Sequence, residues 1–223
     1  MVIGAAPALA TPRPFDSEQL IKISSGNAQY IRIGNRLSGA VSTFGRSFWK
    51  ALATDAPLIV AAISAQGIES AHYADRYFLT PLNMRLLAQV LAAAPAAPKS
   101  MRITTPRLDR LGSAGYLVFH PFAEDNQREK VMRQLWPNAI VEVREKTATA
   151  HARRLSLCLG DGREITILFD QGFGGWRTEG APRHDFRAEP IAQARAILSA
   201  SYSVAGDALG SPFVLFEGPD GDG

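Results

Sequence analysis

Hydrophobic and polar residues alternate with two different periods along this chain. Ala28–Ile33 alternates apolar and polar residues as a half-buried strand does, whereas Arg36–Ala53 places apolar residues at helical spacing. Pro57–Ser64 is a short, almost wholly apolar run, which predicts a strand buried on both faces. Thr80 and Pro81 then provide an N-cap and a proline at the first helical position, so we expect a helix to begin there.

The second half of the chain is richer in strand patterns. A charged helix is expected at Asp125–Leu135, and Gly160–Gly162 has the composition of a hairpin turn. Strand patterns are found at Met101–Thr104, Ala139–Arg144, Arg154–Leu159 and Glu164–Phe169, with a further edge strand at Pro212–Phe216. The order of these elements predicts an α/β fold, in which a mixed sheet carries helices on both faces.

Composition supports one globular domain. We expect a flexible arm at 1–14, one domain at 15–216 and a tail at 217–223, because both ends have little apolar content to pack. The single cysteine, Cys158, excludes an internal disulfide and a cysteine-based zinc site. No apolar run approaches the roughly 20 residues of a membrane span, so a soluble, cytoplasmic protein without metal or cofactor is expected.

Charge is compatible with phosphate ligands without establishing them. The formal net charge is +3 and the isoelectric point is 9.2, with arginine common among the basic residues. The chain has no glycine-rich phosphate loop, His-Glu-x-x-His motif or paired cysteines, which removes the main signals of nucleotide hydrolases, Rossmann oxidoreductases and zinc enzymes.

Two polar clusters remain as candidate sites. His72, Asp75 and Arg76 lie between the expected buried strand and the helix that begins at Pro81. Open α/β sheets place ligand groups at such a position, because strand ends and helix N-termini meet there. The alternative is a loop in which Asp75 and Arg76 form ordinary ion pairs.

The second cluster surrounds the expected hairpin. His151 and Arg153 share a face of one strand, and the hairpin brings Asp170 to the same level. Imidazole, guanidinium and carboxylate groups together suit a phosphodiester, through proton transfer or attack, phosphate binding and orientation of the ring. Trp176 and Arg177 follow in a glycine-rich segment, where the indole is available for stacking. The alternative is a polar strand edge with a glycine-rich turn.

The order of features from Glu69 to Trp176 resembles the phospholipase D-like domain found at the C-terminus of microtubule-interacting-and-transport proteins and in bacterial relatives. The family's Asp-Pro-Tyr strand end is similar to Ala74-Asp75-Arg76-Tyr77. Its His-Asp-Arg element, followed by a glycine-containing hairpin, resembles the region from His151 to Gly172.

The catalytic signature of the phospholipase D superfamily is only partly present. In His-x-Lys-x4-Asp, His151 matches the histidine, Arg153 replaces the lysine and Cys158 replaces the aspartate. The resemblance therefore implies a catalytically degenerate, nucleic-acid- or phosphate-binding subunit of a bacterial DNA-processing or antiphage defence complex, with a helicase as partner.

Two alternatives to this interpretation stay open. One is an active phosphodiesterase or nuclease that uses His151, with a homodimer supplying a second copy of that histidine. The other is a protein-interaction scaffold without chemistry. DNA or RNA is the expected ligand of both the binding subunit and the nuclease.

Overall fold

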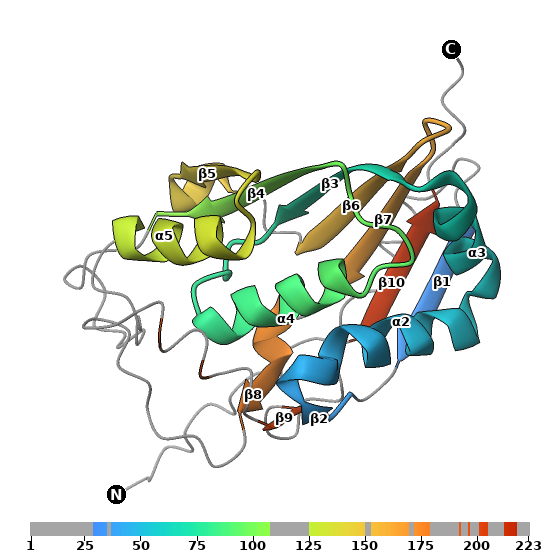
Figure 1. Cartoon of the computed structure of the whole chain (residues 1–223), viewed down its shortest axis with the longest axis horizontal. Coiled ribbons are helices and arrows are strands. Elements are labelled where there is room, and N and C mark those ends of the chain that lie inside the picture. Colours follow the sequence, from blue (N-terminus) through green and yellow to red (C-terminus); the bar gives the residue numbers. More distant parts are fainter. Residues whose placement is uncertain are drawn as a thin grey trace, which may run out of the picture.

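A computed structural model describes residues 29–34, 37–107, 125–149, 153–169, 172–178, 192, 196, 201–204 and 212–217 of the chain. In this part, the chain forms a seven-stranded mixed sheet, a small three-stranded sheet and four α-helices (Figure 1). The predicted α/β class with a mixed sheet is confirmed. The expected arm at 1–14 lies outside the described residues, and so does the expected tail at 217–223 apart from Glu217, which is the last residue of β10.

The large sheet has the spatial order β1-β10-β7-β6-β3-β4-β5. Its strands are β1 (Gln29–Gly34), β3 (Ile68–Ala74), β4 (Ser100–Pro106), β5 (Ile140–Arg144), β6 (Arg154–Leu159), β7 (Glu164–Phe169) and β10 (Pro212–Glu217). β3, β4 and β5 run parallel, and the other neighbours pair antiparallel. β10 lies between β1 and β7, so the prediction of an edge strand there was wrong and β1 forms that end of the sheet.

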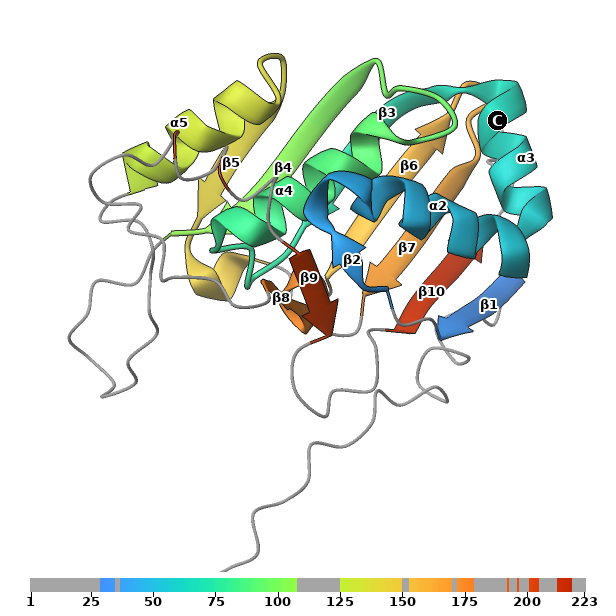
Figure 2. The ribbon, with the colours of Figure 1, turned by 60° about the horizontal axis from the view of Figure 1, so that its bottom comes forward.

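The helices are α2 (Phe44–Asp55), α3 (Pro57–Gln66), α4 (Pro81–Ala92) and α5 (Asp125–Leu135), with short 3₁₀ helices η1 (Val41–Thr43), η2 (Lys146–Ala148) and η3 (Gly172–Gly175). The small sheet has the order β2-β9-β8, from β2 (Gly39–Ala40), β9 (Ser201–Val204) and β8 (Trp176–Thr178). Figure 2 shows this sheet beside the start of α2. The Thr80 side chain caps α4 by accepting from the Asn83 N–H, as the Thr-Pro pair predicted.

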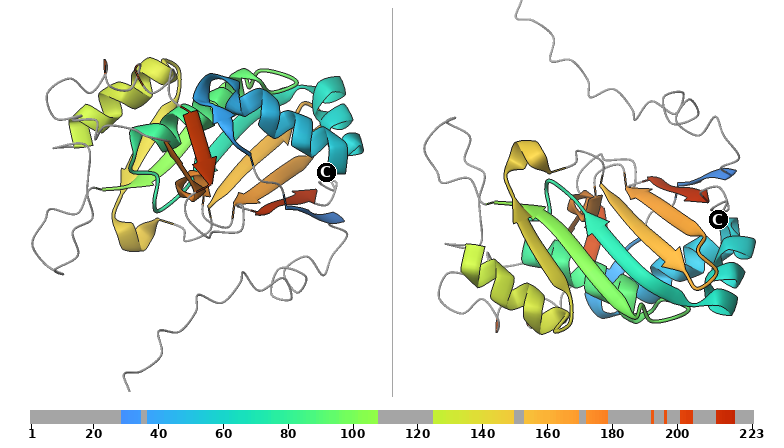
Figure 3. Two further views of the ribbon diagram at one scale, coloured as in Figure 1. Left: turned by 90° about the horizontal axis from the view of Figure 1, so that it is seen from below. Right: turned by 90° about the horizontal axis from the view of Figure 1, so that it is seen from above.

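The described helices α2, α4 and α5 lie on the same face of the large sheet (Figure 3), which differs from the expected cover on both faces. The units β3–α4–β4 and β4–α5–β5 step in the same direction across the sheet. Because such crossovers are almost always right-handed, both helices come to one face. In β6 and β7, buried side chains accordingly alternate with partly exposed ones. We call the face away from these helices the polar face; its side chains include Ser70, His72, Arg102, Thr104, Glu142, Arg144, Arg154, Ser156 and Thr166.

The segment predicted as a buried strand at Pro57–Ser64 is instead helix α3, and the central strand is β3. Ile59 and Ile63 are its buried residues, and they are one helical turn apart, while Leu58 is 82% exposed. Pro57 occupies the first turn, where its fixed φ favours a helix. A short apolar run does not distinguish the two structures, because both period and length are ambiguous.

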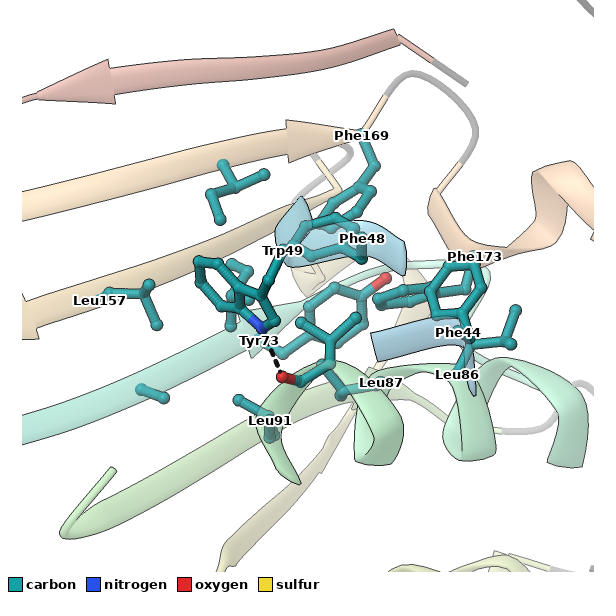
Figure 4. Close-up of a cluster of buried hydrophobic side chains, with 14 of the residues drawn as sticks. Phe44, Phe48, Trp49, Tyr73, Leu86, Leu87, Leu91, Leu157, Phe169 and Phe173 are labelled. Carbon is teal, nitrogen blue, oxygen red and sulfur yellow. Dashed lines mark hydrogen bonds between the residues drawn. The ribbon is translucent and has the colours of Figure 1, made fainter. Parts of the chain in front are cut away.

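The hydrophobic core lies between the sheet and α2 with α4. Trp49 on α2 donates its indole N–H to the Val90 carbonyl on α4 over 2.7 Å. A Cβ at Gly45 would lie 1.8 Å from the Gln89 carbonyl oxygen, so the two helices pack at a distance that only glycine allows. Figure 4 shows the aromatic and leucine side chains that fill this layer, among them Phe44, Phe48, Tyr73, Leu86, Leu87, Leu91, Leu157, Phe169 and Phe173.

Candidate functional site

The carboxyl ends of β3, β4 and β5 meet at one edge of the sheet. β6 is antiparallel to β3 and pairs Arg154 with Ala74, so β6 begins where β3 ends. Asp75 and Arg76 follow β3, and Arg153 precedes β6. The fold thus brings residues of the two sequence clusters, about 80 positions apart, to the same edge of the sheet.

Asp75 is the buried centre of this edge, with 0% exposure. The Tyr73 hydroxyl donates to Asp75 Oδ2 over 2.8 Å, and the Tyr77 backbone N–H donates to Oδ1 over 2.6 Å. Arg153 Nε lies 3.9 Å from Oδ1. Burial, followed by the charge of Asp75, raises the pKa of Tyr73 well above its usual value, so Tyr73 remains a hydrogen-bond donor.

We call Tyr73, Asp75, Tyr77 and Arg153 the Asp75 cluster. Gly172 in η3 packs directly against it. Its φ is +57°, and a Cβ there would lie 2.5 Å from Asp75 Oδ2 and 2.9 Å from Arg153 Cδ. A side chain at this position would therefore displace the carboxylate or the guanidinium stem. The sequence signal for this contact was the glycine-rich segment after β7, although Tyr73 and Gly172 were not among the predicted site residues.

Two guanidinium groups are held in place at the edge. The Arg153 guanidinium carbon lies 4.6 Å from the centre of the Tyr77 ring, a cation–π arrangement, and its side chain stays 20% exposed. Arg76 donates from Nη2 and Nε to the Thr149 carbonyl oxygen, over 2.9 and 3.3 Å. These contacts reduce the side-chain freedom that binding a ligand would otherwise have to remove.

His72 lies on the polar face, in a hydrogen-bonded row that crosses three parallel strands. Its Nε2 is 2.9 Å from Thr104 Oγ1, and that hydroxyl donates to Glu142 Oε2 over 3.5 Å. The Thr104 hydroxyl has one hydrogen and donates it to Glu142, so it can only accept a hydrogen bond from His72. The hydrogen of the neutral imidazole is therefore on Nε2. Burial and then the nearby Arg154 and Arg102 lower the pKa of His72, so its neutral form is favoured.

Glu142 pairs with two arginines of the polar face at once. Arg102 Nη1 is 2.9 Å from its Oε1, and Arg144 Nη2 is 2.6 Å from its Oε2. One carboxylate for two guanidiniums leaves positive charge beside His72. Arg154 is exposed, and its guanidinium has no ion-pair partner within the part of the chain that the structure describes.

We call the resulting surface the arginine edge. It comprises Arg76, Arg102, Arg107, Arg144, Arg153 and Arg154. Its carboxylates are the buried Asp75, the shared Glu142 and Glu145, which lies 3.3 Å from Arg107. Basic groups thus exceed acidic groups at the sheet edge and along the neighbouring polar face, which favours an anionic ligand.

The model of the family described as "DEAD/DEAH box helicase YjiV, C-terminal domain" matches residues 27–215, from just before β1 into β10. The chain belongs to this YjiV C-terminal domain family. The expected link to a helicase is therefore confirmed at the level of the family. No curated protein sequence matches the chain.

The predicted site residues of this YjiV-type domain separate into four groups. Asp75, Arg76 and Arg153 come together at the arginine edge, while His72 faces the polar face, on the other side of the sheet from Tyr73. Trp176 is only 2% exposed and donates its indole N–H to the Leu37 carbonyl over 3.1 Å. Its ring packs edge-on against Phe44, so the prediction that Trp176 stacks on a ligand is wrong.

The remaining predicted residues lie beyond what the structure describes. His151 and Asp170 lie outside the described residues, and so does the side chain of Arg177. The predicted chemistry of His151 therefore stays a prediction. Burial of Trp176 follows from tertiary packing of η3 against α2, which its glycine-rich surroundings in the sequence did not indicate.

Other features of the YjiV-type domain lie away from the arginine edge. Within the described ranges, no group of three or more His, Cys, Asp or Glu side chains is placed to hold a metal ion. A hollow of about 320 Å³ lies between the ends of α4 and α5 and the start of β4, and Leu91, Met101 and Trp136 are among its lining residues. No single described helix is long and apolar enough to cross a membrane, although Val41–Asp55 and Pro57–Gln66 meet that criterion as a pair bent by 117°.

Proposed function

We propose that this YjiV-type domain binds the phosphate backbone of a nucleic acid along the arginine edge. The observation that carries the proposal is a set of six arginines at the carboxyl ends of β3, β4 and β5, the start of β6 and the adjoining polar face, with Glu142 shared between Arg102 and Arg144. Guanidinium groups match phosphate oxygens in charge and in hydrogen-bond geometry. Membership of a family named for a DEAD/DEAH box helicase supports a nucleic-acid ligand.

The resemblance to phospholipase D-like domains extends this proposal. The domain then acts as a catalytically degenerate member of that group, in a bacterial DNA-processing or antiphage defence complex. The arrangement of Asp75 supports a binding role, because the carboxylate is fully buried and is engaged by Tyr73, the Tyr77 N–H and Arg153. A carboxylate whose oxygens are engaged in this way serves to position the neighbouring Arg153 guanidinium.

The test is direct binding of labelled oligonucleotides by fluorescence anisotropy at low salt, with single- and double-stranded DNA and single-stranded RNA. Arg154→Gln should weaken binding about three- to tenfold, since it removes one exposed guanidinium. Arg133→Gln is the matched control, because Arg133 is an exposed arginine on α5, on the opposite face of the sheet. Absence of binding at low salt would reject the proposal.

A phosphodiesterase is the second candidate, and His72 is the observation that favours it. A neutral imidazole flanked by Arg102 and Arg154 has the form of a general base beside a bound phosphate. We expect no cleavage of any of the four substrates, namely single- and double-stranded DNA and RNA, with or without a divalent metal ion. Cleavage that disappears in His72→Ala or in His151→Ala, while binding persists, would establish the nuclease instead.

Helix α3 is the surface that a protein-interaction scaffold would use. It has no charged residue, and Leu58 on it is exposed. This alternative replaces the nucleic-acid proposal if the wild-type domain fails to bind oligonucleotides at low salt.

A further inference from the structure

Tyr77 is an exposed aromatic side chain at the arginine edge. It is 40% exposed, a high value for a tyrosine that is held at two points. Its backbone N–H donates to Asp75 Oδ1, and its ring packs under the Arg153 guanidinium at 4.6 Å. The ring therefore has a fixed position next to a cation.

The anchors of Tyr77 are themselves rigid. Asp75 is fully buried and bound by the Tyr73 hydroxyl, and Gly172 approaches Asp75 and Arg153 closely enough to exclude a side chain. An aromatic ring on such a support loses little conformational entropy when a ligand stacks on it.

From this arrangement we infer that Tyr77 and Arg153 form a nucleotide subsite, in which the tyrosine ring stacks on a base and the guanidinium binds the adjoining phosphate. The inference rests on the proposed function and specifies its substrate class as single-stranded nucleic acid. A base inside a duplex is already stacked on both sides, whereas an unpaired base can lie on a protein ring.

The chemistry favours a base over other occupants of this position. An aromatic ring offers a π-face to any base, and the guanidinium beside it offers charge to the phosphate of the same nucleotide. Arg76 precedes Tyr77 and Arg154 follows Arg153 in the sequence, so two further guanidinium groups are attached next to the subsite residues for neighbouring phosphates.

The experiment compares two single-stranded ligands of equal length and charge, one with bases and one with abasic sites throughout. Wild-type protein should bind the base-bearing strand about tenfold more tightly than the abasic strand. Tyr77→Ala should remove this difference, and Tyr77→Phe should retain it to within about twofold, because the ring is kept. Leu58→Ala, on exposed α3, is the control and should leave both affinities unchanged.

Each outcome separates the subsite from the proposed function. If wild type binds both strands equally, or if Tyr77→Ala weakens both by the same factor, the subsite is wrong while backbone binding stands. If neither strand binds at low salt, the proposed function fails, and the subsite fails with it. Thermal melts of each variant establish that the folded state persists, and circular dichroism of Tyr77→Phe provides the same check for the conservative change.

Discussion

Gly172 shows how a single residue can control the arrangement of the candidate site. Its φ of +57° lies in the left-handed region, and its missing Cβ leaves room for Asp75 and for the stem of Arg153. Asp75 follows β3 and Arg153 precedes β6, so Gly172 in η3 lies against residues at the end of one strand and the start of the other. The position of the Arg153 guanidinium thus depends on a residue that does not itself bind a ligand.

We expect Gly172→Ala to destabilise the domain by about 2 kcal/mol or more, because a left-handed alanine costs about 1–2 kcal/mol before any clash is counted. The variant should also bind oligonucleotides more weakly, since Arg153 must move. Gly174→Ala is the matched control in the same 3₁₀ helix, where a Cβ would meet nothing within 4 Å. Urea unfolding and anisotropy measure both effects, and equal stability of the two variants would contradict this account.

The surroundings of His72 predict how the stability of the domain depends on pH. Its pKa in the folded protein is lowered from the usual 6.5, first by burial and then by Arg154 and Arg102, with Glu142 opposing them. The unfolded chain therefore binds this proton more readily than the folded protein, so protonation favours unfolding. The contribution of His72 to stability is present above about pH 6.5 and is lost as the pH falls below it.

His72→Gln removes this titration and leaves a side chain able to donate to Thr104. The wild type should lose more stability than the variant between pH 7 and pH 5, as measured by urea unfolding at each pH. Parallel stability curves for the two proteins would show that the pKa of His72 is not lowered in the folded protein.

At the scale of elements, the sequence predicted those structures that carry local signals. The Thr80 cap predicted the start of α4, and the glycines at 160 and 162 predicted the hairpin between β6 and β7. The bounds Asp125–Leu135 of α5 were also predicted correctly. α3 was misassigned because its apolar run is short and lacks a polar face, so period and composition gave no distinction.

The candidate site was predictable only where its residues are adjacent in the sequence. Asp75 and Arg76 were identified from their place between a strand and a helix, and Arg153 from its strand. The contact of Glu142 with Arg102 depends on the parallel pairing of β4 with β5, which no local pattern specifies. The closure of the Asp75 cluster by Gly172 likewise depends on the way η3 packs across the ends of β3 and β6.

At the scale of the whole molecule, the two faces of the sheet have different roles. One face packs against α2, α4 and α5, and the other presents hydroxyl, imidazole and guanidinium groups (Figure 3). The arginine edge connects the polar face to the buried Asp75 cluster. A nucleic acid bound along this edge would contact Arg76 and Arg153, which are held by the Thr149 carbonyl and beside the buried Asp75, together with the exposed arginines of the polar face.

The measurement that tests this account most directly is the salt dependence of binding to a single-stranded oligonucleotide. For three to five contacted phosphates, log Kd against log salt should have a slope of about 2 to 3.5, because each contact releases condensed counterions. Replacing both Arg102 and Arg154 by glutamine should lower this slope by about 1.4. Replacing Lys99 and Arg133, two exposed basic residues away from the arginine edge, should leave it unchanged. A slope near zero, or an equal loss in both double variants, would contradict binding at the arginine edge.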